Sequence, residues 1–434
     1  MYRFFSSFFA QTYLKNTTRH PKNKIFIQIA SYRDPELLPT LRDCIEKAKY
    51  PKNLVFSIAW QHSPEDAWDN LDEFKDDKRF KIIDIPHLES EGVCWARNKL
   101  QGQYDDEEYT LQLDSHHRFI QNWDEELIKM YKQLKEMGHE KPLITGYIPS
   151  YDPDNDPGGR INEPWIMHFD RFSPDGILHT MPDTIDDYKD RTRPIPARFY
   201  SAHFAFTTGD FVKEVPHDPN FYFHGEEHSI SARAYTWGYD LFHPVKTTIW
   251  HEYTRRGKKK QWDDVSTWYI KQNGSIERCQ QLFYMKPRTQ DFGIYDFGPV
   301  RTLDDYEKYA GISFQKRAVQ QYTMDKKLPP NPILSNEEYE ASFVKIFKHC
   351  IDVGYDLVPE KDYDFWAIAF HDEQNETMFR QDADENEIRG FFNDPDKYCK
   401  IWRQFETSKQ PAYWVVWPHS KSKGWCERLT GNIG

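Results

Sequence analysis

The chain has 434 residues, of which 29% are charged, 38% hydrophobic and 16% aromatic, and it carries a formal net charge of −12. This length exceeds what a single hydrophobic core usually serves, so we expect one large domain and a smaller second domain. The acidic balance excludes a protein that holds nucleic acid through its overall field, because phosphate neutralisation requires clustered Lys and Arg.

The N-terminal extension, residues 1–23, carries Phe4, Phe5, Phe8 and Phe9 but is interrupted by polar residues. It is too short and too polar to span a bilayer, and the sequence contains no run of about 18 apolar residues. No small-residue cleavage site follows an apolar segment, so we expect neither a transmembrane segment nor a signal peptide. A short amphipathic anchor at a membrane surface stays open as an alternative.

Strands and helices alternate from residue 24 onward. The sequence predicts strands over 25–30, 54–60, 80–85 and 109–113, and helices over 37–45, 93–100 and 123–137. Such alternation is typical of a mostly parallel sheet covered on both faces by helices, in which ligands collect beyond the carboxyl ends of the strands. Ser31-Tyr32-Arg33 and Asp114-Ser115-His116 each follow a predicted strand and are therefore candidate site segments.

The middle of the chain is more polar. Residues 151–196 predict long surface loops, which are usually functional in a compact domain. Structure is expected to resume over 198–207, with a helix over 226–237 and a strand over 247–253. The basic run 255–260 that follows is either a solvated loop or a mobile loop that meets phosphate, and the sequence leaves both readings open.

A Pro-rich linker over 328–332 separates a main domain over 24–327 from an accessory domain over 333–434. The accessory domain is predicted to begin with a helix over 337–350 and to contain strands over 365–370 and 412–417, which makes it β-rich.

The cysteines contain no C-x-x-C pair, so neither a zinc knuckle nor a disulfide framework is indicated. A reducing, cytoplasmic location is the simplest expectation. The six residues are Cys44, Cys94, Cys279, Cys350, Cys399 and Cys426.

The segment Asp114-Ser115-His116 is the sharpest chemical feature. A carboxylate and an imidazole two residues apart point the same way from an extended chain, so Asp114 and His116 can hold one divalent cation. A mixed carboxylate and imidazole set suits Mn²⁺ or a similar first-row ion, whereas Mg²⁺ prefers oxygen ligands.

His251 is the best candidate for a third metal ligand, because it lies at the end of another predicted strand. His117 and His243 are poorer candidates. His117 must point away from His116 if the strand continues, and His243 precedes Pro244.

Gly225-Glu226-Glu227 begins the helix predicted over 226–237. The two carboxylates either complement the helix dipole or act on a substrate, by orienting an acceptor hydroxyl, serving as a base or stabilising an oxocarbenium-like state. The residues alone do not separate these readings. His224, Glu227 and His228 also fit the H-x-x-E-H pattern of a zinc metallopeptidase, but that reading leaves Asp114 and His251 unexplained.

Several motifs occur in one order along residues 24–312. Through them the chain resembles the GlcNAc-transferase family that includes the Skp1 hydroxyproline N-acetylglucosaminyltransferases. It is more distantly similar to the polypeptide GalNAc-transferases, which share an Asp-x-His metal motif and a later metal-binding histidine. The motifs are Ser31-Tyr32-Arg33-Asp34, Trp60-Gln61, Glu91-Gly92-Val93-Cys94-Trp95-Ala96-Arg97, Asp114-Ser115-His116-His117-Arg118-Phe119, Phe223-His224-Gly225-Glu226-Glu227, Gly238-Tyr239-Asp240-Leu241, His251-Glu252-Tyr253 and Val300-Arg301-Thr302-Leu303-Asp304-Asp305-Tyr306-Glu307.

The resemblance implies a retaining enzyme of the GT-A fold over 24–327, with a nucleotide-sugar donor and Mn²⁺ or Mg²⁺. It implies that the metal on the donor diphosphate is ligated by Asp114, His116 and His251. It implies a role for Arg97 in binding donor phosphate or sugar, and for Glu226 and Glu227 in facing the transferred sugar or the acceptor. The remaining donor-binding residues would be Ser31, Tyr32, Arg33, Trp60, Gln61 and Ser115.

The expected function is therefore Mn²⁺-dependent transfer of a sugar, GlcNAc from UDP-GlcNAc, onto a hydroxyl of a protein or glycan. The alternative is a carbohydrate-binding or scaffold protein without catalysis, suggested by the C-terminal residues Trp402, Trp414, Trp417 and Trp425. A dinucleotide or nucleoside-triphosphate site is not indicated, because the sequence has neither G-x-G-x-x-G after the first strand nor G-x-x-x-x-G-K-[ST].

Overall fold

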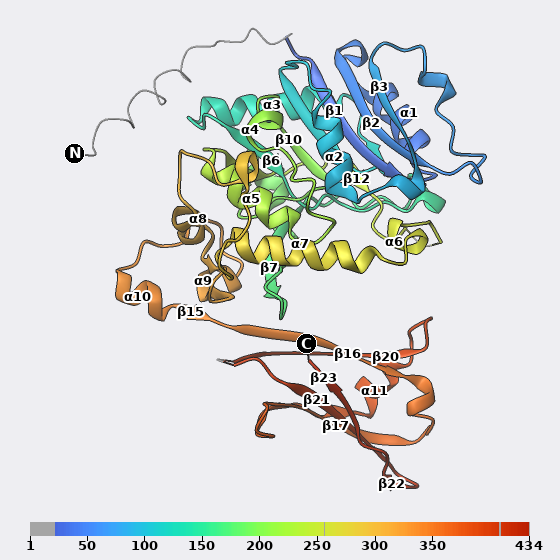
Figure 1. Ribbon diagram of the computed structural model, residues 1–434, viewed down its shortest axis with the longest axis vertical. Helices are drawn as coiled ribbons and strands as arrows, with labels where there is room; N and C mark the ends of the chain where they lie inside the picture. Colours follow the sequence, from blue (N-terminus) through green and yellow to red (C-terminus); the bar gives the residue numbers. More distant parts are fainter. Residues whose placement is uncertain (1–21, 256, 408, 434) are drawn as a thin grey trace. The chain divides into compact units, whose positions relative to one another are not determined.

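The computed structural model describes residues 22–255, 257–407 and 409–433 (Figure 1). The expectations for residues 1–21, including the membrane-surface anchor, lie outside the described residues. The chain forms two compact units. Among the described residues, the first comprises 22–166, 184–274 and 292–301, and the second comprises 167–183, 275–291 and those from 302 onward.

The first unit contains a large sheet and the helices that cover it. Its strands are β1 (Ile25–Tyr32), β2 (Leu54–His62), β3 (Phe80–Pro86), β4 (Tyr109–Leu113), β5 (His117–Phe119), β6 (Pro142–Thr145), β9 (Ile195–Pro196), β10 (Phe204–Thr208), β11 (Asp240–His243) and β12 (Ile249–His251). Its helices are α1 (Leu37–Lys47), α2 (Val93–Gln101), α3 (Trp123–Glu136), α4 (Phe211–Glu214), α5 (Glu226–Thr236) and α6 (Gln261–Asp264).

In the described residues the large sheet has the strand order β3-β2-β1-β4-β10-β6-β11-β9. Strands β3, β2, β1 and β4 are mutually parallel, β10 runs antiparallel to both β4 and β6, and β11 is parallel to β6. The sheet is thus mainly parallel, as the alternation of strands and helices predicts, and the expected α/β fold class is confirmed.

The register brings the sequence motifs to one edge of this sheet. Ser31 and Tyr32 at the end of β1 lie beside Trp60 and Gln61 of β2. Because β10 is antiparallel to β4, its first residue pairs with the last residue of β4. The segments that follow β1, β2 and β4 therefore meet the segment that precedes β10.

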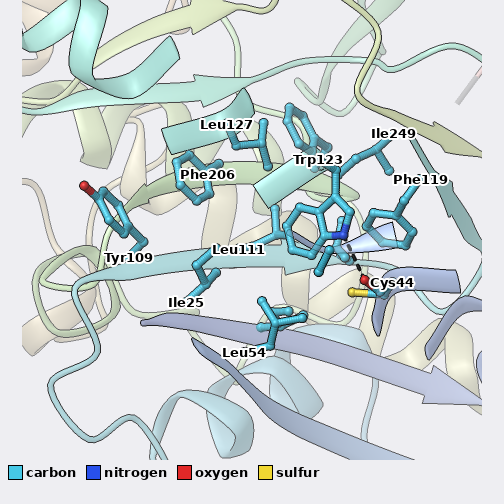
Figure 2. Close-up of a cluster of buried hydrophobic side chains, with 14 of the residues drawn as sticks. Ile25, Cys44, Leu54, Tyr109, Leu111, Phe119, Trp123, Leu127, Phe206 and Ile249 are labelled. Carbon is cyan, nitrogen blue, oxygen red and sulfur yellow. Dashed lines mark hydrogen bonds between the residues drawn. The ribbon is translucent and has the colours of Figure 1, made fainter. Parts of the chain in front are cut away.

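The main core lies between the sheet and helices α1 and α3 (Figure 2). Trp123 of α3 is fully buried in it, and its indole N–H donates a 2.8 Å hydrogen bond to the carbonyl oxygen of Cys44 at the end of α1. Helix α2 packs on the opposite face, where Ala96 and Leu100 join Ala59 and Ile85 in a smaller cluster. Because helices cover both faces of the sheet, a ligand-binding site is expected at its carboxyl edge.

The second unit is rich in strands. Along the chain from 302 onward they are β13 (Ile312–Ser313), β14 (Ala318–Gln320), β15 (Phe343–Val344), β16 (Ile346–Gly354), β17 (Tyr363–His371), β18 (Thr377–Arg380), β19 (Ala383–Asp384), β20 (Tyr398–Glu406), β21 (Tyr413–Ser420), β22 (Gly424–Trp425) and β23 (Leu429–Asn432), with helices α8 (Leu303–Ala310), α9 (Gln321–Met324), α10 (Asn336–Ala341) and α11 (Glu385–Phe391). Residues 167–183 of this unit lie in two further strands, β7 (Trp165–Phe172) and β8 (Leu178–Thr184), and the turn between them. The pair β16–β20 and the sheet around β17 and β21 share one hydrophobic cluster centred on Trp366, Ile368 and Phe370. The expected β-rich C-terminal region is confirmed.

Two predictions of secondary structure were wrong. The segment predicted as loops over 151–196 contains the two-stranded sheet of β7 and β8. The helix predicted over 337–350 ends with α10, and the chain then enters β16, in which Phe347, Ile351 and Val353 face the core. These residues repeat with a period of two, and β16 pairs with β20 along its whole length. The pairing and this period favour a strand over the helix that the sequence pattern predicts.

Helix α7 (Trp268–Leu282) continues from the first unit into the second along the chain. In the described part of the chain, no helix combines the length and the apolar character needed to cross a bilayer.

Candidate functional site

Three side chains meet at the carboxyl edge of the large sheet. Asp114 directly follows β4, His116 comes two residues later, and His251 ends β12, which pairs with β5. The Asp114 carboxylate oxygen Oδ2 lies 3.5 Å from Nε2 of His251 and 3.9 Å from Nε2 of His116. One ligand atom from each residue lies within 4.8 Å of the other two, so the three residues, here the metal cluster, can hold one ion.

The chemistry of these groups fits a divalent cation. Both ring nitrogens of His251 are buried and have no hydrogen-bond partner among the described residues, which is costly unless a ligand supplies one. Burial lowers the pKa of His251 to about 3, so its imidazole is neutral and has a free lone pair. Against the effect of burial, His251, Arg97 and His116 hold the pKa of Asp114 well below its usual range. A carboxylate with imidazole nitrogens is a ligand set for Mn²⁺ or a similar ion.

Arg97 connects the metal cluster to the start of α5. Its buried guanidinium donates to Asp114 Oδ1 at 2.8 Å and to Glu226 Oε1 at 2.6 Å. The other oxygen of Glu226 accepts from the thiol of Cys94, one turn before Arg97 on α2. Both oxygens of Glu226 are thus engaged inside the protein, and the residue holds Arg97 in place.

Cys94, His217 and Glu226 form a second group with the spacing of metal ligands. Its chemistry argues against an ion there. Burial raises the pKa of the Cys94 thiol, so the thiol keeps its proton and donates a hydrogen bond to Glu226. The carboxylate of Glu226 is also paired with Arg97, so the group is already satisfied without a cation.

Glu227 differs from its neighbour. It is half-buried, and it accepts a 2.9 Å hydrogen bond from the backbone N–H of Ala202, shortly before β10. Burial raises the pKa of Glu227 to about 7, and the charges of Glu226 and Asp114 act in the same direction. A carboxyl group that titrates near neutral pH is suited to exchanging a proton with a substrate.

The residues expected to bind a nucleoside lie together at the ends of β1 and β2. The guanidinium of Arg33, which has φ of +43°, donates to both oxygens of Asp66 at 2.6 and 3.0 Å and to Asp264 at 3.0 Å. The hydroxyl of Tyr32 also donates to Asp264, at 2.9 Å. Both side chains are therefore fixed by acidic partners. The Ser31 hydroxyl is buried without a hydrogen-bond partner among the described residues.

Trp60 and Gln61 are held in the same way from β2. The Trp60 indole N–H donates to Asp69 at 2.6 Å, and its ring stacks on His62 with centroids 3.7 Å apart. Gln61 donates to the carbonyl oxygen of Ser31 at 3.0 Å. Burial raises the pKa of Asp69 to about 6. The structure thus brings the predicted donor-binding residues of β1 and β2 into one hydrogen-bonded patch.

The basic run 255–260 includes Arg256, which lies outside the described residues. Its first residue, Arg255, donates to the backbone carbonyl oxygen of Tyr32 at 3.4 Å. Lys258 donates to Glu252 at 2.7 Å. Two residues of this run, Arg255 and Lys258, are therefore hydrogen-bonded to residues of the site segments and are not only solvated.

Two histidines near the metal cluster were not selected from the sequence. The ring of His203 stacks on that of His251 with centroids 4.3 Å apart, and the ring of His117 lies 4.9 Å from it. The sequence made His117 point away from His116 only if the strand continued, and that condition is not met, because β4 ends at Leu113 and the chain begins a new strand, β5. The alternation of one strand does not extend across that break.

The H-x-x-E-H arrangement of a zinc peptidase is not formed. His224 precedes α5, and Gly225 at its N-terminus adopts φ of +100°, so His224 does not share a helical face with His228. In the described residues the groups with metal-ligand spacing do not include His224, Glu227 and His228.

A mainly parallel α/β sheet with a carboxylate and histidine cluster at its carboxyl edge agrees with the fold and the metal site that the sequence motifs lead us to expect of a nucleotide-sugar transferase. The Glycosyltransferase (GlcNAc) family matches residues 24–79 and 70–316 of this sequence, and the chain therefore belongs to that family. The resemblance seen in the sequence motifs is confirmed. A search of curated proteins found no match.

Solved structures with similarity to this chain include two sugar transferases. GalNAc-T7 with UDP, GalNAc and Mn²⁺ is 15% identical with a TM-score of 0.43, and the match covers 65% of this chain and 54% of that one. Residues 1–349 of S. aureus TarS in complex with UDP-GlcNAc are 10% identical with a TM-score of 0.39, covering 63% of this chain and 69% of that one. The chain spans about half the length of the GalNAc-T7 structure that it matches.

Proposed function

We propose that this protein transfers GlcNAc from UDP-GlcNAc to a hydroxyl group of a protein or glycan, with a divalent cation, Mn²⁺, held by Asp114, His116 and His251. The observation that carries the proposal is the metal cluster, whose ligand atoms lie within 4.8 Å of one another at the carboxyl edge of the sheet. Family membership supports the transferred sugar. A bound cation would neutralise charge on the leaving diphosphate as a Lewis acid.

The residues around the metal cluster then have separate roles. Arg97 keeps Asp114 oriented and ionised through their 2.8 Å hydrogen bond, and Glu226 fixes Arg97 from the other side. We assign Glu226 to positioning rather than to contact with the sugar, because its two oxygens are engaged by Arg97 and Cys94.

Glu227 is the proposed group that acts on the substrate. Its pKa of about 7 allows it to accept a proton from, or orient, an acceptor hydroxyl near neutral pH. Its hydrogen bond from Ala202 fixes one oxygen and leaves the other for the substrate. The proposal includes retention of configuration at the transferred sugar, which rests on the resemblance to retaining GT-A families.

The nucleoside of the donor is proposed to bind over the ends of β1 and β2, at Ser31, Tyr32, Arg33, Trp60 and Gln61. The hydrogen bonds from Arg33 and Tyr32 to Asp264 and from Trp60 to Asp69 pre-organise these side chains. Ser115 is better placed to support the metal cluster than to contact the donor, because its hydroxyl is buried and donates to Asp34 at 2.6 Å.

The accessory domain over 333–434, joined through the linker 328–332 to the catalytic domain over 24–327, is proposed to contact the acceptor. Trp417 and Trp425 support this role, since their rings lie 4.4 Å apart and are 37% and 47% exposed. Exposed aromatic faces stack on sugar rings. We also propose a reducing, cytoplasmic location, with which six cysteines outside any disulfide are consistent.

Calorimetric titration with UDP, UDP-GlcNAc, UDP-GalNAc, UDP-glucose and GDP-mannose, each with Mn²⁺ and with EDTA, tests the proposal. We expect UDP-GlcNAc to bind more tightly than the other sugars and to lose its affinity in EDTA. The Asp114→Asn variant is the matched control and should behave in Mn²⁺ as the wild type does in EDTA. A protein that binds none of these nucleotides would refute the proposal.

A further inference from the structure

His116 is connected to a carboxylate that does not belong to the metal cluster. Asp34 lies between the end of β1 and the start of α1, and its side chain is completely buried. Its oxygen Oδ2 lies 2.7 Å from Nδ1 of His116 and accepts from the hydroxyl of Ser115 at 2.6 Å. The other oxygen accepts from the backbone N–H of Glu36 at 3.0 Å.

These contacts decide which nitrogen of His116 carries a proton. Asp34 already accepts hydrogen bonds from a hydroxyl and a backbone amide, so it acts toward Nδ1 as an acceptor. Nδ1 therefore carries the hydrogen, which makes Nε2 the nitrogen available to a cation. Nε2 is the atom that faces Asp114, at 3.9 Å. The bond to Asp34 thus turns the metal-binding nitrogen toward the metal cluster.

The two histidines of the cluster differ in this support. His251 has no hydrogen-bond partner at either nitrogen among the described residues, whereas His116 is held by a fully buried acceptor. The guanidinium of Arg255 lies 3.5 Å from Asp34 and partly balances its charge. A ligating histidine whose second nitrogen donates to a carboxylate is fixed in tautomer and orientation and is a stronger ligand.

We infer that Asp34 is a positioning residue of the metal site: through Nδ1 of His116 it fixes the tautomer and direction of that ligand and thereby sets the affinity for the cation. This inference rests on the proposed metal site, and it assigns to Asp34 no contact with the cation, donor or acceptor.

Titration of the full chain with Mn²⁺, followed by loss of the electron paramagnetic resonance signal of the free ion, tests the inference. We expect Asp34→Asn to weaken Mn²⁺ binding about 10- to 100-fold. Asp34→Glu keeps the charge but moves the carboxylate by one methylene, and it should weaken binding as well. Asp124→Asn is the matched control, because Asp124 is equally buried and accepts from the backbone N–H groups of Lys49 and Tyr50 instead. Its Mn²⁺ affinity should equal that of the wild type.

The outcomes separate the inference from the proposed function. A wild-type protein that does not bind Mn²⁺ removes the metal site and the role of Asp34 together. Wild-type binding with unchanged affinity in Asp34→Asn overturns the role of Asp34 alone, and so does wild-type affinity in Asp34→Glu, which would show that charge suffices. If the variants do not fold, nuclear magnetic resonance of isotope-labelled histidine in the metal-free wild type decides: a proton on Nδ1 of His116 supports the inference, and one on Nε2 overturns it.

Discussion

The carboxyl group of Glu227 should make the protein less stable as the pH rises. Burial raises its pKa from the ordinary 4.5 to about 7, so between these values the folded protein binds more protons than the unfolded chain. Stability therefore falls as the pH rises through this range. The difference between the two pKa values corresponds to about 3 kcal/mol in the free energy of unfolding, and this contribution is fully lost above pH of about 7.

Replacement of Glu227 by Gln tests this sign and magnitude. Gln keeps an oxygen for the N–H of Ala202 but carries no charge. At pH of about 8 the metal-free variant should therefore exceed the wild type in free energy of unfolding by up to about 3 kcal/mol, and this gain should vanish below pH of about 4.5. Urea denaturation followed by tryptophan fluorescence gives the difference. A variant that is no more stable than the wild type at the higher pH, or whose gain does not depend on pH, would show that the carboxyl is not destabilised by burial.

The same variant addresses function. If Glu227 acts on the acceptor, Glu227→Gln should bind UDP-GlcNAc as the wild type does, while turnover falls about 100- to 10,000-fold. Equal turnover would leave Glu227 with a structural role. A variant that is more stable but inactive would show that the charge of Glu227 lowers stability and is needed for catalysis.

Further predictions concern the metal cluster, its support and the core. Asp114→Asn and His251→Ala should each abolish Mn²⁺-dependent UDP binding measured by calorimetry; retained dependence in either variant would exclude it as a ligand. Glu226→Gln should lower the free energy of unfolding by about 3 to 5 kcal/mol, because it breaks the buried pair with Arg97; a loss below about 1 kcal/mol would mean that solvent screens the pair. Trp123→Ala should cost about 3 to 5 kcal/mol in urea denaturation and leave Mn²⁺ affinity in the folded protein unchanged.

Much of the first unit could be predicted because its pattern is local. The strands that became β1, β2, β3 and β4 are short apolar runs between turn residues and helices, and residues that follow parallel strands must meet at one edge. That rule brings Asp114 and His116 to the site. The same reasoning selects His251, but the structure brings it to the site in another way, because β12 pairs antiparallel with β5 and is not a strand of the large sheet.

The roles of Glu226 and Glu227 could not be separated from the sequence, because they are adjacent at the start of one helix. The difference arises from their neighbours. Glu226 meets Arg97 from α2, and Glu227 meets the backbone of Ala202 before β10. These partners are 129 and 25 residues away in the chain, so no local pattern shows them. For the same reason the sequence does not indicate a role for His203, because its stacking on His251 depends on the antiparallel insertion of β10 into the sheet.

The charges around the metal cluster nearly balance, and the small excess indicates what the site is built to hold. Asp114 and Glu226 share Arg97, while Asp34 lies 3.5 Å from Arg255. While Glu227 is protonated, below its pKa of about 7, three carboxylates thus face two guanidinium groups, which leaves one negative charge for a divalent cation. With the cation bound, the excess becomes positive, and this favours a diphosphate at the same edge of the sheet. Binding of the metal and of the nucleotide should therefore strengthen each other by the same factor, since such coupling is reciprocal.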